Sequence, residues 1–277
     1  VANEVVTRPK IGRLCALARL NRITVAVDNP QNVAVLSKLA GDAQVTLNVL
    51  VDIDAGFGCC GVAPTGDAQE LARSVHSSPG LDFQGLMSYE GPLLYQNRGE
   101  LEDETRRRLQ LVLDTRQLIE AEGIAVSTVS VGSTSNYDIA GQMSGITEIQ
   151  AGSYPLMDHN YCRYRTEFTP AAKILASVVS HPVEARAVLD SGHKTTGPDL
   201  GVPFLEGVAG ATATRFSAEH GILELEPEAF TRLKSNEKVW LVPFDLALCV
   251  NQYDYIRAVR RGKLEGFWPV AARGRWD

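Results

Sequence analysis

The chain has 277 residues, of which 44% are hydrophobic and 22% charged, a composition typical of globular proteins. Its formal net charge is −6 and no tract is rich in lysine or arginine, which argues against a nucleic-acid or anionic-membrane surface as the main partner. No apolar run is long enough to span a bilayer and no signal-peptide pattern is present, so we expect a cytoplasmic protein.

The predicted elements begin with VANEVV, which reads as the tail of a strand. Short β-branched runs then alternate with amphipathic stretches up to about residue 156, a pattern that predicts a parallel sheet built from β/α units. The expected strands are residues 22–28, 45–54, 81–90, 125–132 and 146–154. The expected helices are residues 8–20, 30–40, 66–78, 98–122 and, more briefly, 136–142.

After residue 166 the pattern changes to short strands separated by Gly, Pro and Asp turns, which predicts an antiparallel β domain. We therefore expect two domains, at residues 1–165 and 166–277. A complete eight-stranded β/α barrel needs about 250 residues. The first domain is accordingly expected to be a partial (β/α)8 barrel of the TIM type that lacks its first strands. We expect the protein to form a homodimer, or to bind a second chain that supplies the missing strands.

The stretch VDIDAGFGCCGV, residues 51–62, follows a strand with glycines and two adjacent cysteines. The chain's five cysteines are odd in number and lack CxxC spacing, so neither a disulfide framework nor a thiolate zinc site is predicted. A nucleophilic cysteine at Cys59 or Cys60 would need a base and an orienting group. No histidine is near in the predicted strand order, which argues against a thiol site.

Two strand-to-helix junctions, VGSTSNYD and QAGSYPLMD, are rich in Gly, Ser and Thr. Backbone N–H groups and hydroxyls at such junctions can hold a phosphate without a lysine or arginine. Functional groups of parallel barrels gather where the strands end. Neighbouring junctions of this kind therefore predict a phosphate-binding cup.

These segments, together with NEVVTRPKIGRL, LDFQGLMSYEG, FSAEHG, VPFDLALCVNQYD and FWPVAARGR, occur in an order and at spacings that resemble the D-threonine aldolase and D-serine dehydratase family. Its members are pyridoxal-phosphate enzymes with an alanine-racemase-like barrel followed by a β domain. The resemblance implies a lyase for D-amino acids and a homodimer. It implies a cup formed by Gly132, Ser133, Thr134, Gly152, Ser153 and Tyr154, with Tyr89 beside the pyridine ring and Gln150 near its nitrogen.

The sequence departs from the family pattern at three places. The Schiff-base lysine of the family ends the first barrel strand, and no lysine here occupies such a position, so no catalytic residue is assigned. Cys59 stands where the family has an arginine directed at the cofactor ring, which a thiol cannot replace. In the Pro-x-His-x-Cys/Asp metal motif the chain has Asp245 and Ala247, which leaves Asp245 as a single ligand for Mg²⁺, Mn²⁺ or Zn²⁺.

The resemblance predicts first a pyridoxal-phosphate lyase that cleaves β-hydroxy-D-amino acids such as D-threonine to glycine and an aldehyde. Two alternatives stay open. One is an ammonia-lyase of the D-serine dehydratase type. The other is a catalytically inactive homologue or fragment without the Schiff-base lysine.

Overall fold

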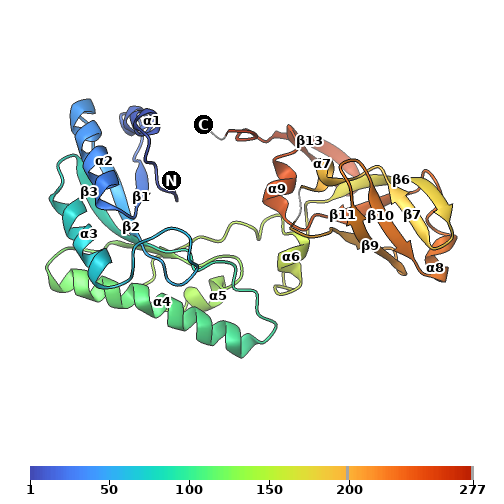
Figure 1. Ribbon diagram of the computed structural model, residues 1–277, viewed down its shortest axis with the longest axis horizontal. Coiled ribbons are helices and arrows are strands. Elements are labelled where there is room, and N and C mark those ends of the chain that lie inside the picture. Colours follow the sequence, from blue (N-terminus) through green and yellow to red (C-terminus); the bar gives the residue numbers. More distant parts are fainter. Residues whose placement is uncertain (198–199, 276–277) are drawn as a thin grey trace. The chain divides into compact units, whose positions relative to one another are not determined.

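The structure is a computed structural model that describes residues 1–197 and 200–275 (Figure 1). Its contacts divide the chain into two compact units, Val1–Gly152 and Ser153–Asp277. The sequence-based domain boundary between residues 165 and 166 lies inside the second unit. Within the described ranges, no helix combines the length and the apolarity that crossing a membrane requires.

The first unit contains a five-stranded parallel sheet whose strands lie side by side in chain order. They are β1 (Thr24–Val27), β2 (Leu47–Asp52), β3 (Leu81–Met87), β4 (Thr128–Val131) and β5 (Glu148–Ile149). The predicted α/β architecture is confirmed. Glu4 adds one isolated parallel bridge to Ala26, beside β1, as the strand-like start of the sequence predicted.

The connecting helices also follow the predicted ranges: α1 (Arg8–Ala18), α2 (Pro30–Ala43), α3 (Gly66–Ser77), α4 (Arg98–Ala121) and α5 (Tyr137–Ala140). Local signals fix their starts. Asn29 caps α2 by accepting a hydrogen bond from the backbone N–H of Asn32 at 2.8 Å, and Pro30 occupies the first helical turn. Asn97 caps α4 by accepting from the N–H groups of Gly99 and Glu100.

Side chains alternate between the two faces of the sheet. Val25, Val27, Val49 and Val51 point to the helix side and share one core with α1–α4. Ala26, Leu50 and Met87 form a separate small cluster. The sheet is therefore closed on the helix side by an apolar core.

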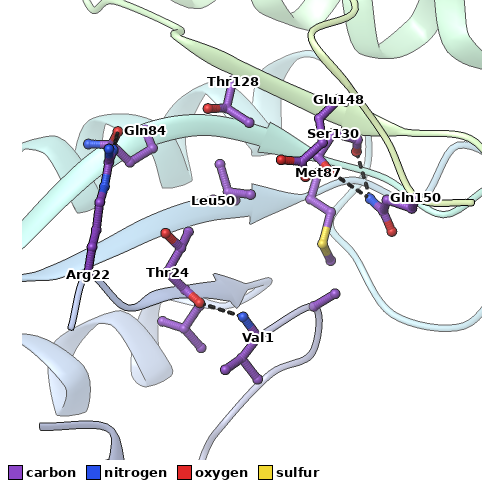
Figure 2. Close-up of a pocket in the computed structure, with 12 residues that line it drawn as sticks. Val1, Arg22, Thr24, Leu50, Gln84, Met87, Thr128, Ser130, Glu148 and Gln150 are labelled. Carbon is purple, nitrogen blue, oxygen red and sulfur yellow. Dashed lines mark hydrogen bonds between the residues drawn. The ribbon is translucent and has the colours of Figure 1, made fainter. Parts of the chain in front are cut away.

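A cavity of about 430 Å³ is lined by side chains from all five strands of this sheet (Figure 2). Many of them are polar, among them Arg22, Thr24, Gln84, Ser130, Glu148 and Gln150. Leu50 and Met87, from the small apolar cluster, also line it. The sheet thus combines an apolar face, packed against helices, with side chains that surround a largely polar cavity.

The second unit is the predicted antiparallel β domain. Its six-stranded sheet has the order β8-β11-β6-β7-β10-β9, and β12 (Tyr255–Arg260) pairs separately with β13 (Lys263–Pro269). The six strands are β6 (Ile174–Val183), β7 (Arg186–Leu189), β8 (Phe204–Glu206), β9 (Ala211–Phe216), β10 (Gly221–Leu225) and β11 (Lys238–Val242). The helices of its described residues have only four or five residues: α6 (His159–Cys162), α7 (His193–Thr196), α8 (Pro227–Phe230) and α9 (Leu246–Val250).

Candidate functional site

The loop after β2 is held by an aspartate at its start. Asp54 Oδ1 accepts hydrogen bonds from the backbone N–H groups of Gly56 at 2.8 Å and Gly58 at 3.0 Å. The N–H of Gly58, followed by that of Gly56, lowers the pKa of Asp54. Gly61 has φ +104°, and a Cβ there would lie 2.4 Å from the Asp54 backbone nitrogen, so only glycine closes this turn.

Cys59 and Cys60 lie exposed on this loop, with their sulfur atoms 4.0 Å apart. The pKa of Cys60 is raised to about 12, and the largest contribution is the negative charge of the nearby Glu4 carboxylate. A nucleophilic cysteine needs the opposite shift, because the thiolate is the reactive form. The raised pKa therefore argues against Cys60 as a nucleophile.

Arg108, from α4, ties this loop to the end of β3. Its Nη1 donates to the backbone carbonyls of Gly56 and Glu90, each at 2.8 Å, while its Nε donates to Glu104 at 2.6 Å. The guanidinium thus connects two strand-end loops through one planar group with several donors. Arg108 is therefore a positioning residue for both loops.

Arg108→Ala is expected to lower the free energy of unfolding of the first unit by about 1–2 kcal/mol, because it leaves two carbonyls without their charged donor. Arg107→Ala, one residue earlier, is the matched control. The Arg107 side chain is 59% exposed and pairs with Glu104, whereas that of Arg108 is 16% exposed. Thermal unfolding followed by helical circular dichroism would show an effect at Arg108 and almost none at Arg107; equal effects would refute the positioning role.

The loop after β4 encloses a carboxylate. Glu90 is fully buried, and its oxygens accept from Asn136 Nδ2 at 2.6 Å and from the Gly132 N–H at 3.2 Å. Burial raises the pKa of Glu90, although these two bonds act in the opposite direction. The carboxylate therefore takes donors that an anionic ligand of this loop would also use.

The other polar groups of the predicted phosphate cup are bonded to one another. The Ser133 N–H donates to Asn136 Oδ1 at 2.8 Å, the Ser135 N–H donates to Ser133 Oγ at 3.1 Å, and the Asn136 N–H donates to the Ser133 carbonyl at 3.3 Å. Ser133, Thr134 and Ser135 are all buried. The loop has the residue types of a phosphate cup, and the N–H groups of Ser133, Ser135 and Asn136 are bonded within it.

Tyr89 and Gln150 also come from strand ends of the first unit. Tyr89 follows β3, is 38% exposed and packs edge-on against Phe57 with ring centroids 5.5 Å apart. Gln150 follows β5, and its Nε2 donates to the Ser130 carbonyl at 2.9 Å and the Ser130 hydroxyl at 3.1 Å (Figure 2). Tyr89 thus presents an aromatic ring at the strand ends, whereas the amide N–H₂ of Gln150 is directed to β4.

The remaining predicted residues lie at the end of the first unit and in the second. Gly152 closes the first unit and is exposed, and a Cβ there would meet no atom within 4 Å. Ser153 and Tyr154 open the second unit, where Tyr154 contacts Phe168 with ring centroids 5.9 Å apart.

Asp245, the predicted metal ligand, caps α9 by accepting from the Leu248 N–H at 2.9 Å. Among the described residues it joins no group of three potential metal ligands. Its position is therefore explained by helix capping, and Ala247 lies inside α9 with no donor atom in its side chain.

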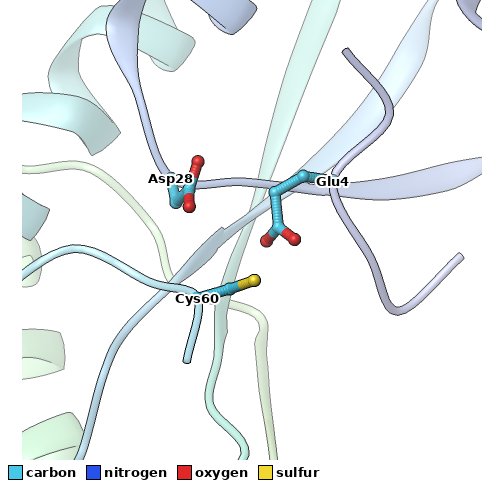
Figure 3. Close-up of side chains that lie close together, drawn as sticks. All are labelled: Glu4, Asp28 and Cys60. Atoms are coloured by element: carbon cyan, nitrogen blue, oxygen red, sulfur yellow. The ribbon is translucent and has the colours of Figure 1, made fainter. Parts of the chain in front are cut away.

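The structure also gathers residues that sequence reasoning did not bring together. Asp52 at the end of β2 faces Glu4 and Asp28, and burial, followed by these two carboxylates, raises the pKa of Asp52 to about 7. Glu4 and Asp28 also lie close to Cys60 (Figure 3). In the sequence, Asp28 and Asp52 could have been identified as candidates because each lies at or near the end of a predicted strand. Their closeness to Glu4 depends on strand pairing, which the sequence does not show.

The comparisons with known proteins agree with this architecture. The family model described as alanine racemase, N-terminal domain, matches residues 6–178, and the model described as putative serine dehydratase domain matches residues 171–259. D-threonine aldolase from Arthrobacter sp is 34% identical, over 99% of this chain and 73% of that protein. The 3-hydroxy-D-aspartate aldolase of Paracoccus denitrificans (strain Pd 1222) is 35% identical, with the same coverage.

Among solved structures, the crystal structure of D-threonine aldolase from Filomicrobium marinum superposes with a TM-score of 0.95 at 32% identity. The match covers 99% of this chain and 76% of that one. Both the parallel α/β unit and the β domain thus have counterparts in one relative. This chain belongs to the D-threonine aldolase and D-serine dehydratase family, whose N-terminal domain is of the alanine racemase type.

Proposed function

We propose that this protein is a pyridoxal-phosphate-dependent D-amino-acid lyase of the aldolase type, which cleaves a β-hydroxy-D-amino acid to glycine and an aldehyde. The observation that carries the proposal is the identity to D-threonine and 3-hydroxy-D-aspartate aldolases along essentially the whole chain. Ancestry alone does not determine an activity. The residues of the site therefore have to be compared with the cofactor.

The described residues of this chain provide only part of a binding site for pyridoxal phosphate. Tyr89 offers an aromatic ring at the end of β3. However, Glu90 and Asn136 already engage donors of the phosphate loop. In the described parts of the chain no lysine stands at the carboxyl end of a strand, since Lys10 and Lys38 of the first unit lie on helices. Covalent attachment of the cofactor therefore has no candidate amine among these strand ends.

The described residues explain how the loops around Tyr89 are held in place, but they do not identify a group that transfers a proton. Arg108 and Asp54 hold the loop at residues 54–62, which places Phe57 against Tyr89. Glu90 fixes the opposite loop. Together these contacts give the strand ends a defined shape around Tyr89, in which a small substrate could be oriented.

The test is an assay of the chain with pyridoxal phosphate and D-threonine, in the presence and absence of a small primary amine that can take the place of a side-chain amine. We expect glycine and acetaldehyde from D-threonine, none from L-threonine, and dependence on the added amine. Absence of turnover under every condition would contradict the proposal and favour a catalytically inactive homologue.

A second candidate, an ammonia-lyase of the D-serine dehydratase type, is favoured by the match of residues 171–259 to a putative serine dehydratase domain. The same assay separates the two, because a dehydratase releases ammonia and a 2-oxo acid instead of glycine. We further propose that the protein acts in the cytoplasm on a free D-amino acid, and that it works as a homodimer or with a second chain.

A further inference from the structure

Three potential metal ligands from separate segments of the first unit converge at one corner of the sheet (Figure 3). Glu4 lies beside β1, Asp28 follows β1, and Cys60 lies on the loop after β2. One ligand atom of each residue lies within 4.8 Å of the other two. Within the described residues, no other group of three His, Cys, Asp or Glu side chains meets this criterion.

The corner carries negative charge that hydrogen bonds balance only in part. Asp28 accepts from the Asn29 amide at 2.9 Å and from the Gly61 N–H at 3.4 Å. Glu4 Oε1, in contrast, is buried and accepts no hydrogen bond from a donor among the described residues, although the Glu4 carboxylate lies against the Asp52 carboxyl and the Cys60 thiol. A buried carboxylate oxygen without a donor is costly, and a bound cation removes that cost. Asp52, only 6% exposed, adds a further carboxyl group beside Glu4.

The thiols determine which cation suits the corner. Cys59 Sγ lies 4.0 Å from Cys60 Sγ, and two sulfur ligands of a tetrahedral zinc ion, each bonded at about 2.3 Å, lie roughly 3.8 Å apart. Cys59 is exposed, and its sulfur lies next to that of Cys60. Thiolate together with carboxylate suits Zn²⁺, whereas Mg²⁺ and Ca²⁺ prefer oxygen ligands alone.

We propose that Glu4, Asp28 and Cys60, with Cys59 as the fourth ligand, form a site for a divalent cation of the zinc type. The proposed site also accounts for a cysteine, rather than an arginine, at position 59. The fixed positive charge of an arginine on this loop would repel a metal cation, whereas a cysteine supplies a ligand for it. The proposed ligands all belong to the first unit and do not include Asp245, and metal binding can be measured without turnover.

Cobalt titration of the reduced, EDTA-treated full chain tests the proposal, because tetrahedral Co²⁺ bound to thiolates gives intense charge-transfer absorbance. We expect this absorbance to saturate at one equivalent of Co²⁺ and to be displaced by Zn²⁺ but not by Mg²⁺. Cys60→Ser should abolish the band and Cys59→Ser should halve it. Glu4→Gln, which keeps the side-chain shape, should weaken binding at least tenfold, on the order found when a metal-site partner is lost.

Cys162→Ser is the matched control, since this partly buried cysteine lies in the second unit and should leave the titration unchanged. Helical circular dichroism establishes that each variant is folded. Absence of the charge-transfer band at one equivalent, or an unchanged band in folded Cys60→Ser, would overturn the proposal.

Discussion

Glu90→Ala is expected to lower the free energy of unfolding of the first unit by about 3 kcal/mol, because two buried donors each lose their acceptor. These donors are Asn136 Nδ2 and the Gly132 N–H, and the shape of the loop at residues 132–136 depends on both. Glu90→Gln should cost less, about 1–2 kcal/mol, since one amide oxygen can still accept from Asn136.

The two units can be followed separately in this measurement. The longer helices, α1–α4, all lie in the first unit, so helical circular dichroism reports mainly on it. All three tryptophans follow residue 153 in the sequence and none belongs to the first unit, so their fluorescence is an internal reference. Glu102→Ala, which removes an exposed pair with Arg106, is the control. A change of less than 0.5 kcal/mol in Glu90→Ala, the range typical of surface substitutions, would show that Glu90 does not hold the loop.

The second large effect concerns the dependence of stability on pH. Burial and the neighbouring carboxylates raise the pKa of Asp52 from 3.8 to about 7. The unfolded chain therefore gives up this proton at lower pH than the folded chain. The protonated Asp52 side chain therefore stabilises the folded first unit below about pH 4. This contribution is lost as pH rises to about 7, which lowers the free energy of unfolding by on the order of 1–3 kcal/mol.

Asp52→Asn should remove this slope and stabilise the metal-free first unit above pH 7. Asp54→Asn is the opposite control. The pKa of Asp54 is lowered by the Gly58 N–H, so its contribution is present at neutral pH and is lost as pH falls through the folded pKa. Melting curves between pH 3 and 8, a range that includes the onset of the loss expected for Asp54, would decide when recorded in EDTA. A slope that is unchanged in Asp52→Asn would contradict the assignment.

Sequence reasoning predicted the elements of the first unit well, because their signals are local. Asn29-Pro30 and Asn97 mark the starts of α2 and α4, and alternating valines mark β1 and β2. It was less informative about side-chain hydrogen bonds. The amide N–H₂ of Gln150, a residue expected near a ring nitrogen, donates to the Ser130 carbonyl in the structure, and that contact is not visible in a sequence pattern. The expected role of Gln150 stays a prediction.

Residues close together in the chain were enough to predict the alternation of strands and helices, the change to a β domain and the departures at Cys59 and Ala247. The meeting of Glu4, Asp28 and Cys60 at one corner, and the position of Glu90 inside the loop after β4, depend on the folded chain. Strand pairing sets these neighbours, and a shift of one residue would point the side chains to the other face.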